Sequence, residues 1–362
     1  MKYLEEYRDP VLAKRLLKHI GTAAARVGRP VTIMEVCGSH TQAIGRCGIR
    51  KLLPPGIRLI SGPGCPICVT SAGDVDRTLW LAGREGILFA TFGDMMRVPG
   101  TGEASLQRLR AAGADVRVVS SAIDCIALAE GEPTRDVVFM GIGFETTAPT
   151  IASTVRTART RGLTNLSVFS VHKIVPPALR LLIADPQMSI DGFLCPGHVS
   201  VMLGSAAYGF LPEAGKAAVI TGFEPVDVLE GVLLLLGQLE RQKPAVAIQY
   251  SRVVRPEGNP RAMAVMEEVF ATRAAEWRGL GRIPGSGLSF RREYEEFDAE
   301  KRFSIPEFHS EENPGCSCGT VLRGLMDPET CSLFRRVCTP ANPVGPCMVS
   351  SEGSCAAHYR YG

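Results

Sequence analysis

VTIMEVCGSHTQAIG, residues 31–45, contains the unit from which this chain is built. Its first six residues form an apolar run of the kind found in buried strands. A polar loop with glycine follows, and the sequence after that loop has helical character. Strand, loop and helix in this order are the elements of an α/β fold.

The same plan recurs along the chain. The other strand-like runs lie at residues 57–60, 86–92, 114–119, 137–142, 165–170, 191–195 and 217–221. Because these runs lack strict alternation and are interleaved with helical stretches, they predict parallel sheets covered on both faces. We therefore predict an α/β protein with two similar parallel-sheet domains, residues 30–132 and 133–245, that face each other across a cleft.

The remaining residues have a different character. Helical patterns cover residues 1–29 and about 260–278, and from Ile283 the chain is rich in Gly, Pro and Cys. Six of the 12 cysteines fall between Cys316 and Cys355. We predict a third, Cys-rich domain, mainly helical or irregular, from residues 1–29 and 246–362. Its N-terminal helix is expected to fold back on the cysteine-rich tail, around a metal centre.

Composition limits the class of protein. A chain of 362 residues with 45% apolar content can bury a large core. The net charge of +3 is small and Lys and Arg are scattered, so no nucleic-acid partner is expected. The N-terminus lacks an apolar signal segment, and the apolar run at 228–237 is about half the roughly 20 residues of a spanning helix. We expect a cytoplasmic protein with no membrane contact.

Twelve cysteines in a reducing compartment indicate metal, cluster or redox chemistry rather than structural disulfides. From Cys318 onward the gaps between cysteines are 12, 6, 8 and 7 residues, wider than the pairs typical of zinc sites. Wide gaps favour an iron-sulfur cluster, which thiolates reach from separate loops. Structural zinc is the alternative, and spacing alone does not say which four cysteines bind.

Cys65 and Cys68 lie two residues apart in GPGCPICVT, directly after the strand-like run 57–60. Such a pair can be a metal clamp, a reversible disulfide or a turn that contains cysteine. The two-residue gap lets a dithiol close to a disulfide and lowers the thiolate pKa. A redox dithiol is therefore our interpretation, with metal ligation as the alternative.

Other polar residues follow the predicted strands, where parallel sheets bind ligands. They are Cys37, His40, Asp94, Glu145, His172, Cys195, His198 and Glu224. Asp94, Glu145 and Glu224 can hydrogen-bond a ligand, although capping of the next helix is a simpler explanation. His198 is expected to face the cleft near Cys195, and His40 is either functional or a capping or packing histidine.

Several uncommon strings occur in order over nearly the whole chain. They are MEVCGSHT, GPGCPICVT, TFGDMMRVPG, GFETTAPT, CPGHVS, GFEPVDVL and CTPANPVGPCMVSSEGSCAA. The chain thereby resembles the HypD family of hydrogenase-maturation proteins. The resemblance implies a redox-active scaffold rather than a conventional turnover enzyme. With the small chaperone HypC, it would assemble the Fe(CN)2CO group of [NiFe]-hydrogenases, while HypE supplies cyanide.

The resemblance also implies a [4Fe-4S] cluster held by four cysteines with gaps of 14, 6 and 16 residues. Cys316, Cys331, Cys338 and Cys355 match this spacing. The resemblance further suggests that the two remaining tail cysteines, Cys318 and Cys347, form a second dithiol near the cluster.

A ferrous iron that carries cyanide and carbonyl prefers soft donors such as thiolate. We expect Cys37 to bind this iron together with a cysteine of the chaperone, and His40 to donate a proton or orient a ligand. Asp94, Glu145 and Glu224 are candidate partners of cyanide. Electrons could pass between the cluster and the dithiol of residues 65–68, as in ferredoxin:thioredoxin reductase. Two other functions stay open: a stand-alone disulfide reductase and a zinc-stabilised adaptor.

Overall fold

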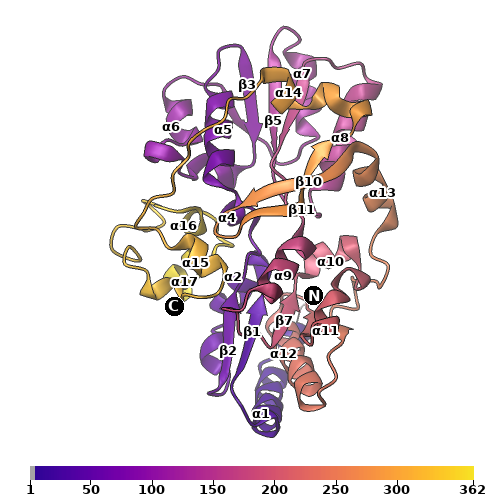
Figure 1. The fold of residues 1–362 in the computed structure, drawn as a ribbon, viewed down its shortest axis with the longest axis vertical. Coiled ribbons are helices and arrows are strands. Elements are labelled where there is room, and N and C mark those ends of the chain that lie inside the picture. Colours follow the sequence, from indigo (N-terminus) through magenta and orange to yellow (C-terminus); the bar gives the residue numbers. More distant parts are fainter. Residues whose placement is uncertain (1–4) are drawn as a thin grey trace.

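Two parallel β-sheets organise residues 5–362, the part of the chain that the computed structural model describes (Figure 1). The first sheet consists, in spatial order, of β2 (Ile57–Ser61), β1 (Val31–Glu35), β7 (Gly192–Cys195), β8 (Ala217–Ile220) and β9 (Val246–Ile248). The second consists of β4 (Val116–Val118), β3 (Ile87–Thr91), β5 (Asp136–Gly141) and β6 (Leu166–Ser170). The predicted α/β class with two parallel-sheet units is confirmed, and each of the eight predicted runs contains a strand.

The two sheets share one plan. In each, the chain first forms an inner strand, adds the next strand on one side, and adds the later strands on the other side. Strands such as β3 and β6 are buried along their whole length because helices cover both faces of the sheet. This explains why the sequence shows continuous apolar runs instead of an alternating pattern.

The division of the chain differs from the predicted boundaries. The predicted domain of residues 30–132 contains β1 and β2, which belong to the first sheet, and β3 and β4, which belong to the second. The predicted domain of residues 133–245 is divided in the same way. The second sheet is an insertion between β2 and β7, so the domains at 30–132 and 133–245 were wrong. A strand-loop-helix pattern identifies each unit, but strand pairing over a long range decides which sheet receives it.

Helices surround the sheets. Those before β7 are α1 (Pro10–Val27), α2 (Gly38–Arg46), α3 (Ile49–Leu52), α4 (Pro66–Val69), α5 (Ala72–Ala82), α6 (Leu106–Ala111), α7 (Asp124–Gly131), α8 (Ala148–Thr160) and α9 (Val175–Ala184). Those after β7 are α10 (Gly197–Leu203), α11 (Phe210–Glu213), α12 (Pro225–Glu240), α13 (Pro260–Val269), α14 (Ala299–Phe303), α15 (Cys318–Leu322), α16 (Pro346–Val349) and α17 (Ser354–Tyr361). Short 3-10 helices lie at Glu6–Arg8, Gly93–Arg97, Thr101–Glu103, Ala206–Tyr208, Arg292–Phe297 and Pro328–Thr330.

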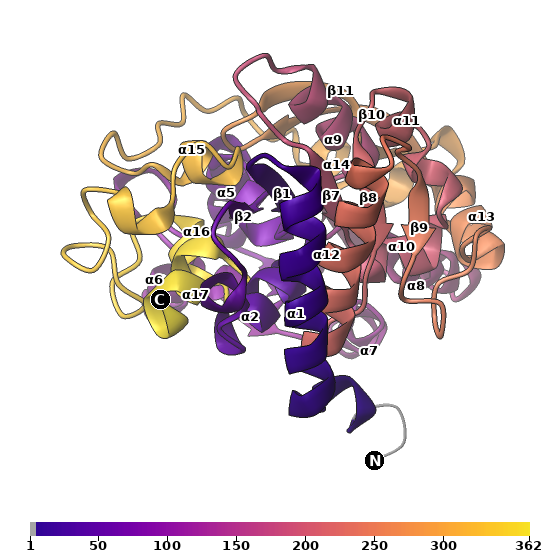
Figure 2. The same ribbon diagram turned by 90° about the horizontal axis from the view of Figure 1, so that it is seen from below.

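Helix α1 begins at a strong cap, because the Asp9 carboxylate accepts the backbone N–H groups of Val11 and Leu12 at 2.7 and 3.3 Å. Its apolar face, which includes Leu16 and Ile20, packs against α12 on the first sheet (Figure 2). The expectation that this helix folds back on the cysteine-rich tail was therefore wrong. Residues 1–4 of that predicted range lie outside the described residues.

The helical pattern predicted for residues 260–278 is correct only as far as Val269. There α13 ends and the antiparallel hairpin of β10 (Phe270–Trp277) and β11 (Gly281–Phe290) begins. Ala and Glu in β10 favour a helix locally, but pairing with β11 overrides that preference. Phe270, Leu288 and Phe290 of this hairpin pack into the core beneath the second sheet.

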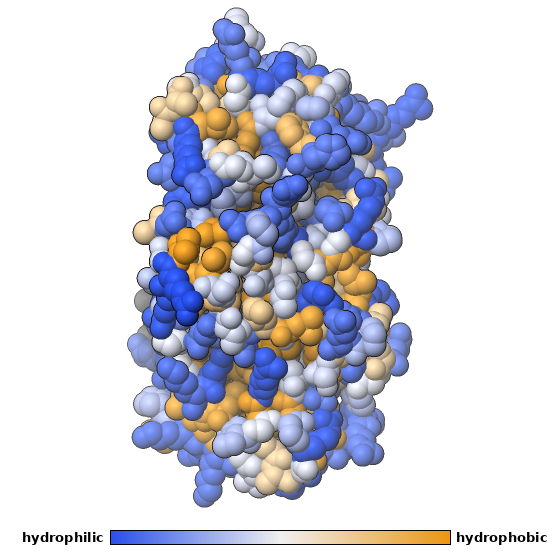
Figure 3. All heavy atoms as spheres, turned by 60° about the vertical axis from the view of Figure 1, so that its left-hand side comes forward, coloured by the Kyte–Doolittle hydropathy of each residue, from blue (hydrophilic) through white to orange (hydrophobic). Residues whose placement is uncertain are grey.

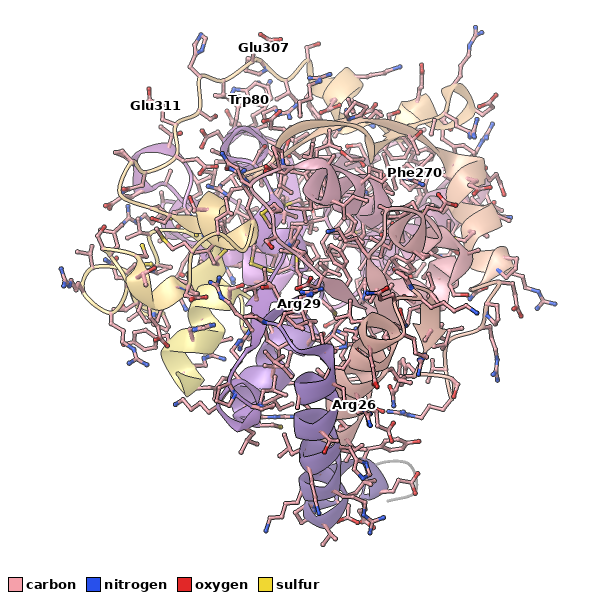
Figure 4. All side chains as sticks on the ribbon, turned by 60° about the horizontal axis from the view of Figure 1, so that its bottom comes forward. Arg26, Arg29, Trp80, Phe270, Glu307 and Glu311 are labelled. Atoms are coloured by element: carbon pink, nitrogen blue, oxygen red, sulfur yellow. A yellow bond between two sulfur atoms is a disulfide. The ribbon has the colours of Figure 1, made fainter. Side chains whose placement is uncertain are left out.

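The cysteine-rich tail, residues 316–362, lies beside the first sheet (Figure 1). Its helix α17 packs against α2, while α15 and α16 pack against α4. Residues 246–248 form β9 of the first sheet, so the range predicted for the third domain does not form one separate unit. The loop that leads to the tail runs along the periphery, where Glu307 and Glu311 point outward (Figure 4).

Candidate functional site

Four of the predicted site residues follow the strands at the switch points of the two sheets, where neighbouring loops leave in opposite directions. Cys37 follows β1 and His198 follows β7, which is next to β1. Asp94 follows β3 and Glu145 follows β5 in the same arrangement. The two sets of loops meet in one continuous core, so the interface between the sheets is packed in this structure.

Cys37 lies between β1 and α2 and is only 7% exposed. The next loop, after β2, runs directly beside it, because a Cβ on Gly64 would lie 2.5 Å from the Cys37 Cα and still closer to the Cys37 nitrogen. The backbone N–H of Gly38 donates to the Gly64 carbonyl at 2.9 Å. Only glycine permits this approach of the two loops.

Cys65 and Cys68 are joined by a disulfide, with their Cα atoms 5.2 Å apart. Cys65 precedes helix α4, and its Sγ also accepts the backbone N–H of Cys68 at 3.3 Å. Both residues are buried. Because β1 and β2 are neighbours and end at the same edge, their loops bring this disulfide next to the Cys37 loop.

Two carboxyl groups flank Cys37. Glu35 is fully buried, and it accepts the Thr41 hydroxyl at 2.6 Å and the Cys37 backbone N–H at 3.3 Å. Burial raises the pKa of Glu35 to about 7. Burial, followed by the Glu352 charge, raises the pKa of the Cys37 thiol to about 12. In this arrangement the Cys37 thiol holds its proton.

Glu352 was not among the predicted site residues. It comes from the cysteine-rich tail, yet its carboxylate accepts the Ser39 hydroxyl at 2.6 Å, and a Cβ on Gly38 would lie 2.5 Å from its own Cβ. The tail thereby covers the start of α2. A residue 315 positions away from Cys37 leaves no local signal of this contact. The one hint in the sequence is that SSEGS, residues 350–354, lies between the tail cysteines Cys347 and Cys355.

His40 is fully buried on α2. Its Nε2 faces the Gly222 carbonyl at 2.9 Å and the Thr221 hydroxyl at 2.9 Å, and burial lowers its pKa to about 4. Its Nδ1 has no partner among the described residues. Phe223 lies against both His40 and the exposed His198, with ring centroids 4.7 and 4.1 Å apart.

Glu145 is buried at the switch point of the second sheet. One carboxyl oxygen accepts the Val175 N–H at the start of α9, at 3.0 Å, while the other has no partner among the described residues. Burial raises the pKa of Glu145 to about 7. The buried His172 nearby shares a hydrogen bond of 3.0 Å with Ser170, and burial lowers its pKa to about 3.

Asp94 and Glu224 have structural partners. Asp94 is exposed and accepts the Ser350 hydroxyl of the tail at 3.3 Å. Glu224 precedes α12, where it forms a reciprocal capping box with Asp227, and it pairs with Arg8 at 2.5 and 2.8 Å. The helix-capping explanation considered for Glu224 therefore agrees with its position.

Five tail cysteines line one small cavity between α15, α16 and α17. Its cysteines include the four that match the spacing of the family pattern: Cys316, Cys331, Cys338 and Cys355. Backbone N–H groups point toward these sulfurs, for example Val344 toward Cys338 Sγ at 3.4 Å. Such thiols, spaced around a cavity and met by N–H donors, fit an iron-sulfur cluster. Within residues 5–362, no three Cys, His, Asp or Glu side chains converge to hold a single metal ion.

The other two tail cysteines connect this cavity with the disulfide. Cys318 lines the cavity, and the fully buried Cys347 lies beside Cys318 and Cys355. Neither forms a disulfide. Cys318 is on α15 and Cys347 is on α16, and both helices pack against α4, which carries Cys68. The tail cysteines and the disulfide belong to one continuous core.

A larger cavity of about 640 Å³ lies between α6 and the tail. Its lining includes four charged residues, Arg97, Arg108, Arg278 and Glu312. Leu333 lines both this cavity and the cysteine cavity.

On the side of the molecule shown in Figure 3, hydrophobic residues form separate patches among hydrophilic ones. None of the described helices is long and apolar enough to cross a membrane.

Comparison with known proteins gives one family. The HypD family profile, described as Hydrogenase formation hypA family, matches residues 11–362. Hydrogenase maturation factor HypD2 of Bradyrhizobium diazoefficiens is 47% identical over 370 residues, which covers 100% of this chain and 97% of that protein. Hydrogenase maturation factor HypD of Rhodobacter capsulatus is 47% identical over 372 residues (100% and 98%). The HypD of Escherichia coli is 43% identical over 367 residues (100% and 98%).

Proposed function

This chain belongs to the HypD family of hydrogenase formation proteins, and we propose that it is the scaffold on which the Fe(CN)2CO group of [NiFe]-hydrogenases is assembled. A role in hydrogenase maturation agrees with the names of its relatives. In this proposal the iron is cargo. A HypC-type chaperone contributes a second thiolate ligand, and a HypE-type protein supplies cyanide.

One observation carries the proposal: three kinds of cysteine site lie next to one another in space. Cys37 stands beside the loop of the Cys65–Cys68 disulfide, and the helix of that disulfide packs against the helices of Cys318 and Cys347. Beyond them lies the cavity lined by the cluster cysteines. A thiolate for iron and a disulfide for redox chemistry are the groups that such a scaffold requires.

Cys316, Cys331, Cys338 and Cys355 would hold a [4Fe-4S] cluster, which supplies one-electron transfer when it is bound. The N–H groups directed at their sulfurs would tune its potential. Reduction of the Cys65–Cys68 disulfide needs two electrons and two protons and yields two thiols. An external reductant must supply these electrons.

Cys37 would bind the iron as a thiolate, so its proton must leave when the metal arrives. Burial and the Glu352 charge oppose that loss, because both raise the pKa of the Cys37 thiol. Withdrawal of Glu352 from Ser39 would remove one of these two effects and uncover the thiol. His40, held neutral by burial, is placed to orient the loop that follows β8 through Gly222.

Infrared spectroscopy of the complex with the chaperone tests the scaffold. We expect bands of metal-bound cyanide and carbonyl in the wild-type complex and in a Cys125→Ala control, since Cys125 lies buried under the second sheet. Cys37→Ala should abolish both bands and retain cluster iron. Unchanged bands in Cys37→Ala would move the iron site elsewhere.

Iron and sulfide analysis tests the cluster separately. Cys338→Ala should lose cluster iron and sulfide, whereas Cys125→Ala should keep both. Full iron and sulfide content in Cys338→Ala would contradict the ligand assignment. Stoichiometric zinc in place of iron would favour the adaptor function.

The disulfide favours one second candidate, a stand-alone disulfide reductase. That function needs turnover with a partner disulfide and no cyanide-bearing iron. Infrared bands on the chaperone complex distinguish the two, because only the scaffold carries the ligated iron.

A further inference from the structure

The tip of the β10–β11 hairpin, residues 277–281, is hydrogen-bonded to the end of α4, the helix that carries Cys68 and is called here the disulfide helix. Trp277 forms an antiparallel bridge with Thr70, and the Arg278 N–H donates to the Val69 carbonyl at 2.9 Å. The Arg278 Nε donates to the Thr70 carbonyl at 3.0 Å. Val69 is the last residue of α4 and follows Cys68, so these bonds fix the end of the helix that carries the disulfide.

The same tip touches the cysteine-rich tail on its other side. Gly279 has a φ of +76°, and a Cβ there would lie 2.7 Å from the carbonyl oxygen of Gly319. A Cβ on Gly319 would lie 2.8 Å from the Gly279 Cα. Two glycine backbones are therefore in direct contact, and a side chain on either would separate them. Gly319 directly follows Cys318 on α15.

The tip is itself rigidly held. Trp277 is 1% exposed, its Nε1 donates to the Ser286 hydroxyl at 2.9 Å, and its ring stacks on Phe144 from the loop after β5. Arg278 is 6% exposed and pairs with Glu312 at 3.1 Å. The buried and hydrogen-bonded Trp277 and Arg278 therefore fix the position of the tip between the elements on its two sides.

We propose that residues 277–281 act as a clasp that holds the disulfide helix α4 against the cysteine helix α15, with Arg278 and Gly279 as positioning residues. The proposal rests on the proposed function, because it assigns the clasp the task of keeping Cys68 and Cys318 in register for thiol chemistry. The β10–β11 hairpin spans from the second sheet to this point, so the clasp also ties both thiol sites to that sheet.

The chain offers a matched pair of substitutions. Gly279→Ala introduces a Cβ at a φ of +76° and against Gly319, whereas Gly281→Ala introduces one at a φ of +74° with nothing within 4 Å. Both carry the cost of a left-handed alanine, so only contact with the tail differs. Gly319→Ala opens the same contact from the other side at a helical φ, and it keeps the test open if Gly279→Ala does not fold.

The measurement is the rate at which dithiothreitol reduces the Cys65–Cys68 disulfide in the folded, full-length protein, followed by alkylation and mass spectrometry. Attack on buried sulfurs requires local opening, so the clasp should limit this rate. We expect reduction about tenfold faster in Gly279→Ala and Gly319→Ala than in wild type, and within about twofold of wild type in Gly281→Ala.

Equal rates in Gly279→Ala, Gly319→Ala and wild type would overturn the clasp, as would an equal acceleration in Gly281→Ala. Iron and sulfide contents are measured on the same samples. Absence of iron and sulfide from the wild type would count against the proposed cluster, while the reduction rates would still decide the clasp.

Discussion

Replacement of Gly64 by alanine tests whether close contact between two loops builds the thiol site. The new Cβ would lie 2.5 Å from the Cys37 Cα, and ordinary contact begins near 3.4 Å, so the loops must separate by about 1 Å. Overpacking of this kind costs about 1–3 kcal/mol. The separation also stretches the 2.9 Å bond from the Gly38 N–H to the Gly64 carbonyl. Its loss adds about 1 kcal/mol.

We therefore expect Gly64→Ala to lower the free energy of unfolding by about 2–4 kcal/mol, measured by urea denaturation. Gly73→Ala is the control, because its Cβ in α5 would have no neighbour closer than 3.9 Å. There alanine should leave the protein unchanged or stabilise it by up to about 1 kcal/mol. If Gly64→Ala matched Gly73→Ala in stability, the contact between the two loops would not be tight.

Three further outcomes are expected. Gly345→Ala would place a Cβ 2.6 Å from two sulfurs of the cysteine cavity, so it should lower cluster iron content, and full iron by chemical analysis would contradict this. Lys173→Met removes one of the two cations that pair with buried Asp74, at 2.9 Å, while Arg77 stays at 2.6 Å. It should cost about 1.5–3 kcal/mol in urea denaturation, and a loss below about 1 kcal/mol would oppose it. Glu145 has a pKa raised from 4.5 to about 7, so its contribution to stability is present below pH 4.5 and is lost as the pH rises through 7. Glu145→Gln should therefore gain about 3 kcal/mol on wild type between pH 4.5 and 8, and parallel stability curves would exclude this.

The sequence indicates the elements of the site better than the contacts between them. The position of Cys37 and of the Cys65–Cys68 pair after two strands followed from the local pattern, and the structure puts both at one sheet edge. The contact of Glu352 with Ser39 could not be predicted, since it joins residues 313 positions apart through packing of the tail. The pKa directions of Glu35 and Cys37 likewise arise from burial, which no short stretch of sequence reports.

The amino-acid sequence by itself determined the eight strand-bearing runs, because a strand buried between helices needs a continuous apolar stretch that is visible locally. Tertiary structure alone decided that β1 and β2 join β7 rather than β3, that α1 packs on α12, and that residues 270–277 form a strand. The physical reason is the range of the forces involved. Periodicity records which face of an element is buried, while the partner that buries it is selected by packing among distant segments.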